Sequence, residues 1–145
     1  MGFKLTVNWQ TSSSEEGEFN RDHQITYGSG QVVNASSAVE YKGNAEKVNP
    51  EEGLLGALSS CHMLTFLAIA HLKRLPVVSY VDHATAELGK NEDGKVAVTK
   101  MNLFPEVVFG EGVEVSEAVI DKIHQKAHAN CFIANSLACD VKINY

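Results

Sequence analysis

The stretch from Asn49 to Arg74 constrains the fold most, because it predicts one long helix that is apolar on nearly every face. Asn49 is suited to cap the free amides, Pro50 to occupy the first helical position, and Glu51 to interact with the positive end of the helix dipole. Leu75-Pro76 predicts the end of the helix. A helix that is apolar nearly all round is buried on most faces. We therefore expect a central helix, wrapped by sheet or by a partner subunit.

Alternation of apolar and polar residues predicts strands on both sides of this helix, and for residues 3–9 it predicts a strand with one buried face. Glycines 28 and 30 predict a hairpin turn, and Ser116 predicts the cap of a second helix. The expected fold is α+β: one domain over residues 1–145, with an antiparallel sheet wrapped around the long helix, in the order βββ-α-ββ-α-β. The strands are predicted at residues 3–9, 22–27, 31–35, 77–88, 95–104 and 139–145.

Charge and composition exclude several classes of partner. Twelve Lys and Arg against eighteen Asp and Glu give a net charge of −6, without a basic cluster, so nucleic acid is not an expected partner. The chain has no uninterrupted apolar run of about 20 residues, so we expect no membrane span. Residues 1–6 show no export signal, and three cysteines is an odd number. These features predict a cytoplasmic protein in a reducing compartment.

Two of the three cysteines are candidates for chemistry. Cys61 lies in the long helix beside Ser59, Ser60 and His62, and Cys131 follows the second helix. A peroxide-reducing thiol forms a sulfenic acid that a second cysteine can trap as a disulfide, so the two are interpreted as a redox pair brought together by folding. A reactive thiol needs a lowered pKa, which requires a nearby positive charge or hydrogen-bond donors. His62 points about 100° away from Cys61 around the helix, so the stabilising charge has to come from elsewhere.

Two other interpretations of the cysteines stay open. In the first, both thiols are inert core residues, as predicted for Cys139 on the apolar face of the last strand. The competing chemical interpretation is a metal site. Its ligands would come from Cys61, Cys131, His62, His71, His124 and His128.

The motifs resemble those of the OsmC/Ohr family of thiol-dependent hydroperoxide reductases, and more closely those of its OsmC-type branch. The matching segments are Asn20-Arg21-Asp22-His23, Asn49-Pro50-Glu51-Glu52, Ala57 to Leu64, His128 to Cys131 and Asn135 to Leu137. They span nearly the whole chain, in order and spacing. One departure is Phe132, where many members of the family have proline after the second cysteine.

The resemblance implies a role for each of four residues. Cys61 would be the peroxidatic cysteine and Cys131 the resolving one, whereas Arg21 would hold the thiolate and Glu51 would orient Arg21. A planar guanidinium can bind a thiolate and a carboxylate together. The implied activity is reduction of organic hydroperoxides to alcohols, with hydrogen peroxide as a second candidate substrate. Apolar neighbours of Cys61 such as Met63, Leu64 and Phe66 would favour the organic peroxides. An external dithiol of the lipoyl type would restore the thiols, and no cofactor would be needed.

The spacing of these residues also bears on assembly. Ten residues separate Glu51 from Cys61, about 15 Å along a continuous helix, which a side chain cannot span. Unless Gly53 and Gly56 bend the helix, Glu51 and Arg21 serve the thiol of a second subunit. We therefore expect an intertwined homodimer with two sites at its interface. The alternative function is a non-catalytic dimer that binds a ligand or a metal through the same Cys and His residues.

Overall fold

The computed structural model describes residues 1–11 and 19–145. The chain forms two compact units, Met1–Gly53 and Leu54–Tyr145, and each is described by itself. Among the described residues the elements follow the order βββ-α-ββββ-α-β, so the predicted α+β class is confirmed. The predicted extent of a single domain, residues 1–145, stays a prediction.

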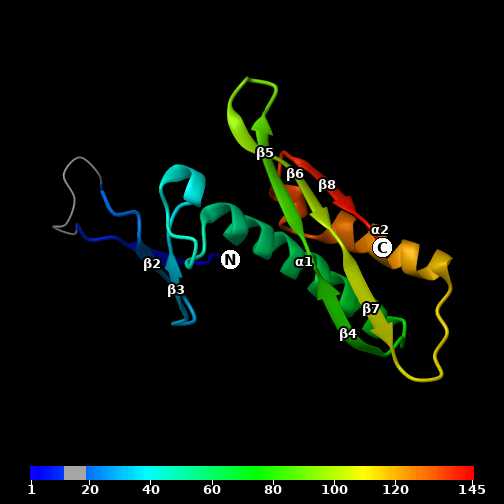
Figure 1. Cartoon of the computed structure of the whole chain (residues 1–145). Helices are drawn as coiled ribbons and strands as arrows, with labels where there is room; N and C mark the ends of the chain where they lie inside the picture. Colours follow the sequence, from blue (N-terminus) through cyan, green and yellow to red (C-terminus); the bar gives the residue numbers. More distant parts are fainter. Residues whose placement is uncertain (12–18) are drawn as a thin grey trace. The chain divides into compact units, whose positions relative to one another are not determined.

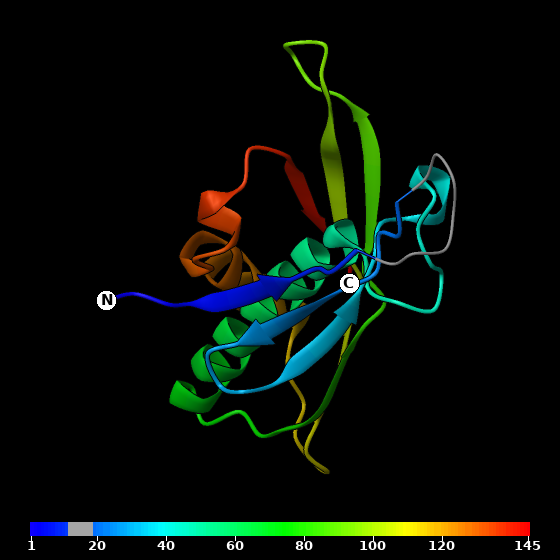
Figure 2. The ribbon, with the colours of Figure 1, turned by 90° about the vertical axis from the view of Figure 1, so that its left-hand side faces the viewer.

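The first unit contains a three-stranded antiparallel sheet in the order β1-β2-β3, coloured blue in Figure 2. The predicted hairpin is confirmed, since Gly30 adopts a positive φ of 90° and donates its N–H to the Tyr27 carbonyl at 2.9 Å. The expectation that residues 3–9 bury one face is wrong within this chain, where Leu5 is 52% and Val7 60% exposed. The strands are β1 (Leu5–Asn8), β2 (His23–Tyr27) and β3 (Val32–Ala35), followed by a 3-10 turn, η1 (Val39–Tyr41).

Helix α1 extends from Pro50 to Leu72, and both of its ends follow from local chemistry. Asn49 caps the start as predicted: its Oδ1 accepts from the Glu52 amide at 2.8 Å. At the other end Arg74 adopts a left-handed φ of 58°. The amides of Arg74 and Leu75 bond back to His71 and Ala70, which is a Schellman motif completed without glycine. The helix therefore ends two residues before the predicted Arg74.

The prediction that α1 is buried on most faces is wrong within the chain. Its buried residues form a single stripe, Leu58, His62, Phe66 and Ala70, whereas Leu64 is 59% and Leu72 82% exposed. The most apolar 18-residue window has a mean hydropathy of 1.7, and only 22% of it is buried. By length and composition alone the helix could cross a membrane, a property that it shares with core helices of water-soluble proteins.

The second unit divides the predicted strand 77–88 into two, and it adds a further strand after the predicted strand 95–104, which corrects the expected element order. The break between β6 and β7 coincides with two features of the backbone: the Phe104 amide donates to the Asp82 carboxylate at 2.7 Å, and Pro105 has no N–H to offer a neighbour. Strand β8 joins β6 in parallel. The strands, labelled in Figure 1, are β4 (Val77–Asp82), β5 (Thr85–Lys90), β6 (Val96–Leu103), β7 (Pro105–Phe109) and β8 (Asp140–Ile143).

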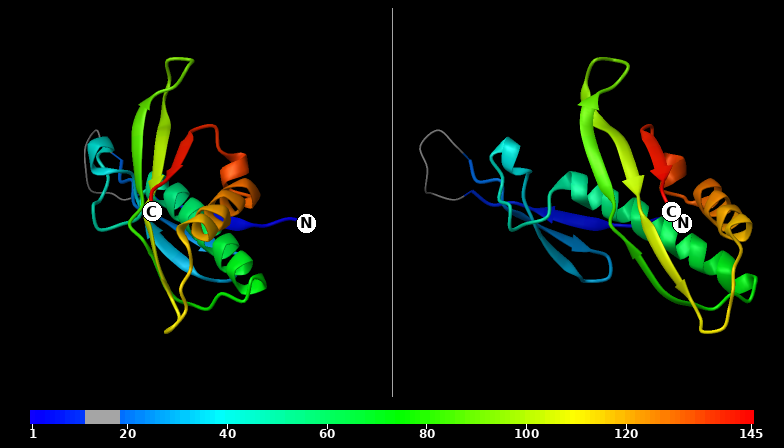
Figure 3. Two further views of the ribbon diagram at one scale, coloured as in Figure 1. Left: turned by 90° about the vertical axis from the view of Figure 1, so that its right-hand side faces the viewer. Right: turned by 45° about the vertical axis from the view of Figure 1, so that its right-hand side comes forward.

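A second helix, α2 (Glu117–Asn130), completes the core of this unit. Ser116 caps it as predicted, with its Oγ accepting from the Val119 amide at 3.3 Å. A short 3-10 turn, η2 (Ala134–Ser136), precedes β8. Both helices lie on one side of the strands (Figure 3), where Phe66 of α1 and Ile123 of α2 share one hydrophobic cluster with residues of β4 and β7.

A buried histidine pair connects the two helices. His62 and His124 are each 1% exposed, and their rings stack with centroids 5.3 Å apart. His62 Nε2 lies 3.0 Å from His124 Nδ1, so one ring donates and the other accepts. Burial, reinforced by a neighbouring histidine, lowers the pKa of each ring to about 4, so both are neutral at pH 7.

This pair predicts a loss of stability in mild acid. The unfolded chain binds protons at these rings below pH 6.5, whereas the folded chain binds them only near pH 4. The free energy of unfolding should therefore fall as the pH is lowered from 6.5 towards 4, by an amount on the order of 3 kcal/mol per histidine. Urea unfolding across this range measures the slope. The double variant His62→Phe/His124→Phe should flatten it, and the exposed control His71→Phe should not; equal slopes in all three proteins contradict the assignment.

Candidate active site

The second unit brings the side chains of Cys61 and Cys131 into hydrogen-bonding contact. Cys61 lies midway along α1 and is half-buried, whereas Cys131 follows the last residue of α2 and is fully buried. Both thiols are free, so no disulfide joins them. The packing of α2 against α1 thus brings together two cysteines that are seventy positions apart in the sequence.

The turn after α2 also surrounds the two sulfurs with backbone N–H groups. The amides of Phe132 and Ile133 donate to the Cys61 sulfur, and the next amide, Ala134, donates to Cys131 Sγ at 3.4 Å. The Thr65 hydroxyl lies within reach of the same sulfur and of the Cys61 carbonyl, 2.8 Å away. Three successive amides therefore face the thiol pair, an arrangement that favours anions.

These contacts shift the pKa values of the two thiols in opposite directions. Burial by itself raises the pKa of Cys61, but the hydrogen bonds from the Cys131 thiol and from the Ile133 and Phe132 amides outweigh it, and the net effect is a lowered pKa. Burial raises the pKa of Cys131, and its hydrogen bond to Cys61 raises it further. Cys61 is therefore the more acidic thiol of the pair, and Cys131 is the one that holds its proton more firmly.

The sequence interpretation required a positive charge or hydrogen-bond donors near Cys61, but it did not identify these backbone amides as the donors. Every residue except proline has a backbone N–H, so nothing in the sequence marks Phe132 and Ile133 as hydrogen-bond donors to the Cys61 sulfur. The third cysteine behaves as expected: Cys139 is partly buried and packs against the cluster that contains Leu58, Met101 and Cys131. It is a core residue.

Arg21 belongs to the other unit, where it borders a largely apolar hollow of about 450 Å³. Its Nη1 donates to the Phe19 carbonyl at 2.9 Å, and the guanidinium carbon lies 4.1 Å from the centroid of the Phe19 ring, a cation–π contact. The hollow is lined by Val7, Trp9, Phe19, Arg21, His23, Ser36, Ser37 and Pro50.

Glu51 lies in the first turn of α1, in the same unit as Arg21. Its Oε2 atom is buried and has no hydrogen-bond partner among residues 1–11 and 19–145. A buried carboxylate oxygen without a partner is costly, so this atom is available to a donor from outside the described contacts. The four predicted site residues thus fall into two pairs: the thiols in the second unit, and Arg21 with Glu51 in the first.

The metal interpretation finds no geometric support in the described part of the chain, where no group of three or more His, Cys, Asp or Glu side chains is arranged to hold an ion. His62 and His124, two of the suggested ligands, bond to each other instead.

Comparison with known proteins agrees with the resemblance found in the motifs. Residues 43–145 match the family described as OsmC-like protein, a range that includes both cysteines and Glu51 but not Arg21. The chain therefore belongs to the OsmC-like family.

Three relatives illustrate the range of similarity. A solved OsmC-like protein of unknown function from Vibrio cholerae is 38% identical, with a TM-score of 0.95 over 99% of this chain and 98% of that one. The uncharacterized protein YmaD of Bacillus subtilis is 26% identical and covers 97% of this chain and 89% of its own length. An organic hydroperoxide resistance protein from Elizabethkingia anophelis shares the fold at 15% identity, with a TM-score of 0.73 over 99% and 92% of the two chains.

The amide donors lead to a prediction about Phe132. Its side chain is 82% exposed, and Cys131 already has the extended backbone that a following proline requires, so Phe132→Pro should fold while losing one N–H. The pKa of Cys61 should rise, and alkylation of Cys61 by iodoacetamide at pH 7 should slow by roughly tenfold, the worth of a hydrogen bond of about 1.5 kcal/mol. Phe132→Ala keeps the N–H and is the matched control. Equal alkylation rates in the two variants contradict the role of this amide.

Proposed function

We propose that the protein is a thiol-dependent peroxidase that reduces organic hydroperoxides to alcohols. The observation that carries this proposal is the reduced thiol pair, in which contacts lower the pKa of Cys61 and raise that of Cys131. A nucleophilic thiolate beside a protonated second thiol is the arrangement that a two-cysteine peroxidase requires. The fold shared with an organic hydroperoxide resistance protein is consistent with it.

In the first step the Cys61 thiolate attacks the distal oxygen of the hydroperoxide, ROOH. The O–O bond breaks, the sulfur is oxidised to a sulfenic acid, and the alkoxide takes a proton and leaves as the alcohol. The Phe132 and Ile133 amides keep Cys61 anionic before the attack, because hydrogen bonds to the charged form favour it.

In the second step the Cys131 sulfur attacks the sulfenic sulfur of Cys61, giving an intramolecular disulfide and one water molecule. The two side chains are already in contact in the reduced protein, so this step needs little movement of the backbone. An external dithiol then reduces the disulfide by thiol–disulfide exchange and is itself oxidised. The family resemblance favours a lipoyl-type dithiol in the cytoplasm.

Arg21 and Glu51 complete the proposed site. Arg21 would orient the peroxide and the thiolate, and Glu51, whose Oε2 lacks a partner among the described residues, would hold the guanidinium. The apolar hollow beside Arg21 suits the organic part of the substrate. Since Glu51 lies ten residues from Cys61 on a continuous helix, we assign this pair to the thiols of a second subunit.

The exposed surface of α1 supports such a homodimer. Leu54, Leu64 and Leu72 are 38%, 59% and 82% exposed. Burying apolar area stabilises by about 25 cal/mol per Å², so a second copy that covers this helix is strongly favoured. We propose no membrane and no nucleic acid as partners.

Substitution of each cysteine tests the reaction. Cys61→Ser should abolish peroxide consumption, a loss of more than about a thousandfold, because it removes the nucleophile. Cys131→Ser should consume one equivalent of cumene hydroperoxide per chain and then stop as a sulfenic acid, which dimedone labels. Cys139→Ser is the matched control and should keep full turnover with dihydrolipoamide. Turnover in Cys61→Ser would exclude the mechanism.

Mixing inactive proteins tests the shared site. Cys61→Ser and Arg21→Ala should each be inactive alone, because one lacks the nucleophile and the other the guanidinium. After unfolding and refolding together they should regain about a quarter of the wild-type activity, since statistical heterodimers carry one intact site out of two. Sedimentation equilibrium gives the oligomeric state of the mixture. A monomer, or a mixture without regained activity, contradicts the assembly.

A further inference from the structure

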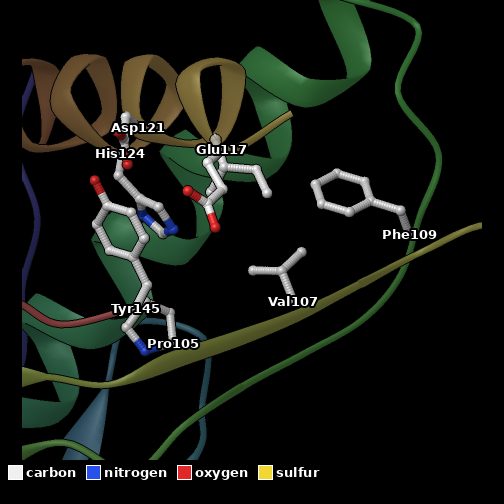
Figure 4. A pocket seen from close by; sticks show the side chains of 8 residues that line it. Pro105, Val107, Phe109, Glu117, Asp121, His124 and Tyr145 are labelled. Atoms are coloured by element: carbon white, nitrogen blue, oxygen red, sulfur yellow. The ribbon is translucent and has the colours of Figure 1, made fainter. Parts of the chain in front are cut away.

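A second hollow lies in the unit that holds the thiols and takes no part in the proposed peroxidase reaction. It has a volume of about 410 Å³ and lies between α2, β7 and the ring of Tyr145 (Figure 4). This volume falls within the range of small-molecule sites in proteins.

The two sides of this hollow differ in chemistry. Strand β7 contributes an apolar wall that includes Val107 and Phe109. Helix α2 contributes Glu117, Asp121 and His124, which follow one face of the helix at spacings of four and three residues. The described residues that line the hollow thus include two carboxylates and neither lysine nor arginine.

His124 supplies an independent sign of a missing partner. The side chain is 1% exposed, and its Nε2 has no hydrogen-bond partner among the described residues, although Nδ1 bonds to His62. Figure 4 shows the His124 ring between Tyr145 and Glu117. An unpaired buried polar atom costs about 1–3 kcal/mol, which a ligand atom at this position would recover.

We propose that this hollow binds a small organic ammonium ion with an apolar body. The ammonium group donates to His124 Nε2 and to the Glu117 carboxylate, and the alkyl or aryl body lies against Val107 and Phe109. Asp121, which hydrogen-bonds the Tyr145 hydroxyl, adds a second negative charge nearby.

The protonation state of His124 at pH 7 suits an ammonium ligand. The pKa of His124 is lowered to about 4 by burial and by His62, so at pH 7 the ring is neutral and one nitrogen has a free lone pair. When Nδ1 carries the proton and donates it to His62, Nε2 is an acceptor. An ammonium ion selects this tautomer. A carboxylate ligand would meet Glu117 and Asp121 as like charges.

Calorimetric titration of the whole reduced protein at pH 7.5 tests the proposal with three probes of one chain length: n-hexylamine, 1-hexanol and hexanoate. Hexylamine should bind at least tenfold more tightly than hexanol, and hexanoate should not bind. Equal binding of the amine and the alcohol would contradict the proposal, because the hollow would then bind ligands only through their apolar part. Absence of amine binding up to about 10 mM, roughly ten times the Kd of about 1 mM expected of a weak ligand, would mean that the hollow holds only water.

Two variants locate the bound amine. Glu117→Gln should weaken hexylamine binding at least fivefold, whereas Glu114→Gln, an exposed carboxylate outside the hollow, should leave it unchanged. Because Glu117 is exposed, its substitution should not affect folding. The ¹⁵N shift of His124 Nε2 should move to the unprotonated value on binding. Equal effects of the two substitutions, or an unchanged histidine signal, would overturn the proposal. Peroxidase activity does not enter this test.

Discussion

The hydrogen bond between the Cys61 and Cys131 side chains is the interaction on which the proposed chemistry depends. It exists because the end of α2 and the turn before η2 place Cys131 and two amides against the middle of α1. Amides at fixed positions stabilise a thiolate without reorganising at the moment of reaction. In the proposed reaction the Cys61 thiolate would thus be supported within its own unit, and Arg21 would act on the substrate as much as on the sulfur.

The other constraint is the amount of apolar surface that the chain leaves uncovered. Helix α1 buries one stripe, and in the N-terminal sheet Leu5 and Val7 are more than half exposed. Surfaces of this kind are seldom stable in water without a partner. A second copy of the chain would account for the exposed helix and, at the same time, for the separation of Glu51 from Cys61.

The elements with a local cause were predicted well from the sequence. Asn49 and Ser116 cap their helices through side chains that any sequence-based argument can identify, and Gly30 supplies the positive φ of the hairpin. Strand β7 was missed, because it pairs with β4, a strand that is distant in the sequence. The histidine pair was missed for the same reason, since His62 and His124 meet only when the helices pack.

The sequence by itself determined the fold class, the helix boundaries to within two residues, the family and which cysteines to examine, because these depend on local periodicity, capping and motif spacing. Only the tertiary structure decided which of the two thiols is acidic. That difference arises from backbone N–H groups and from burial, and both are properties of how the segments pack rather than of the residues themselves.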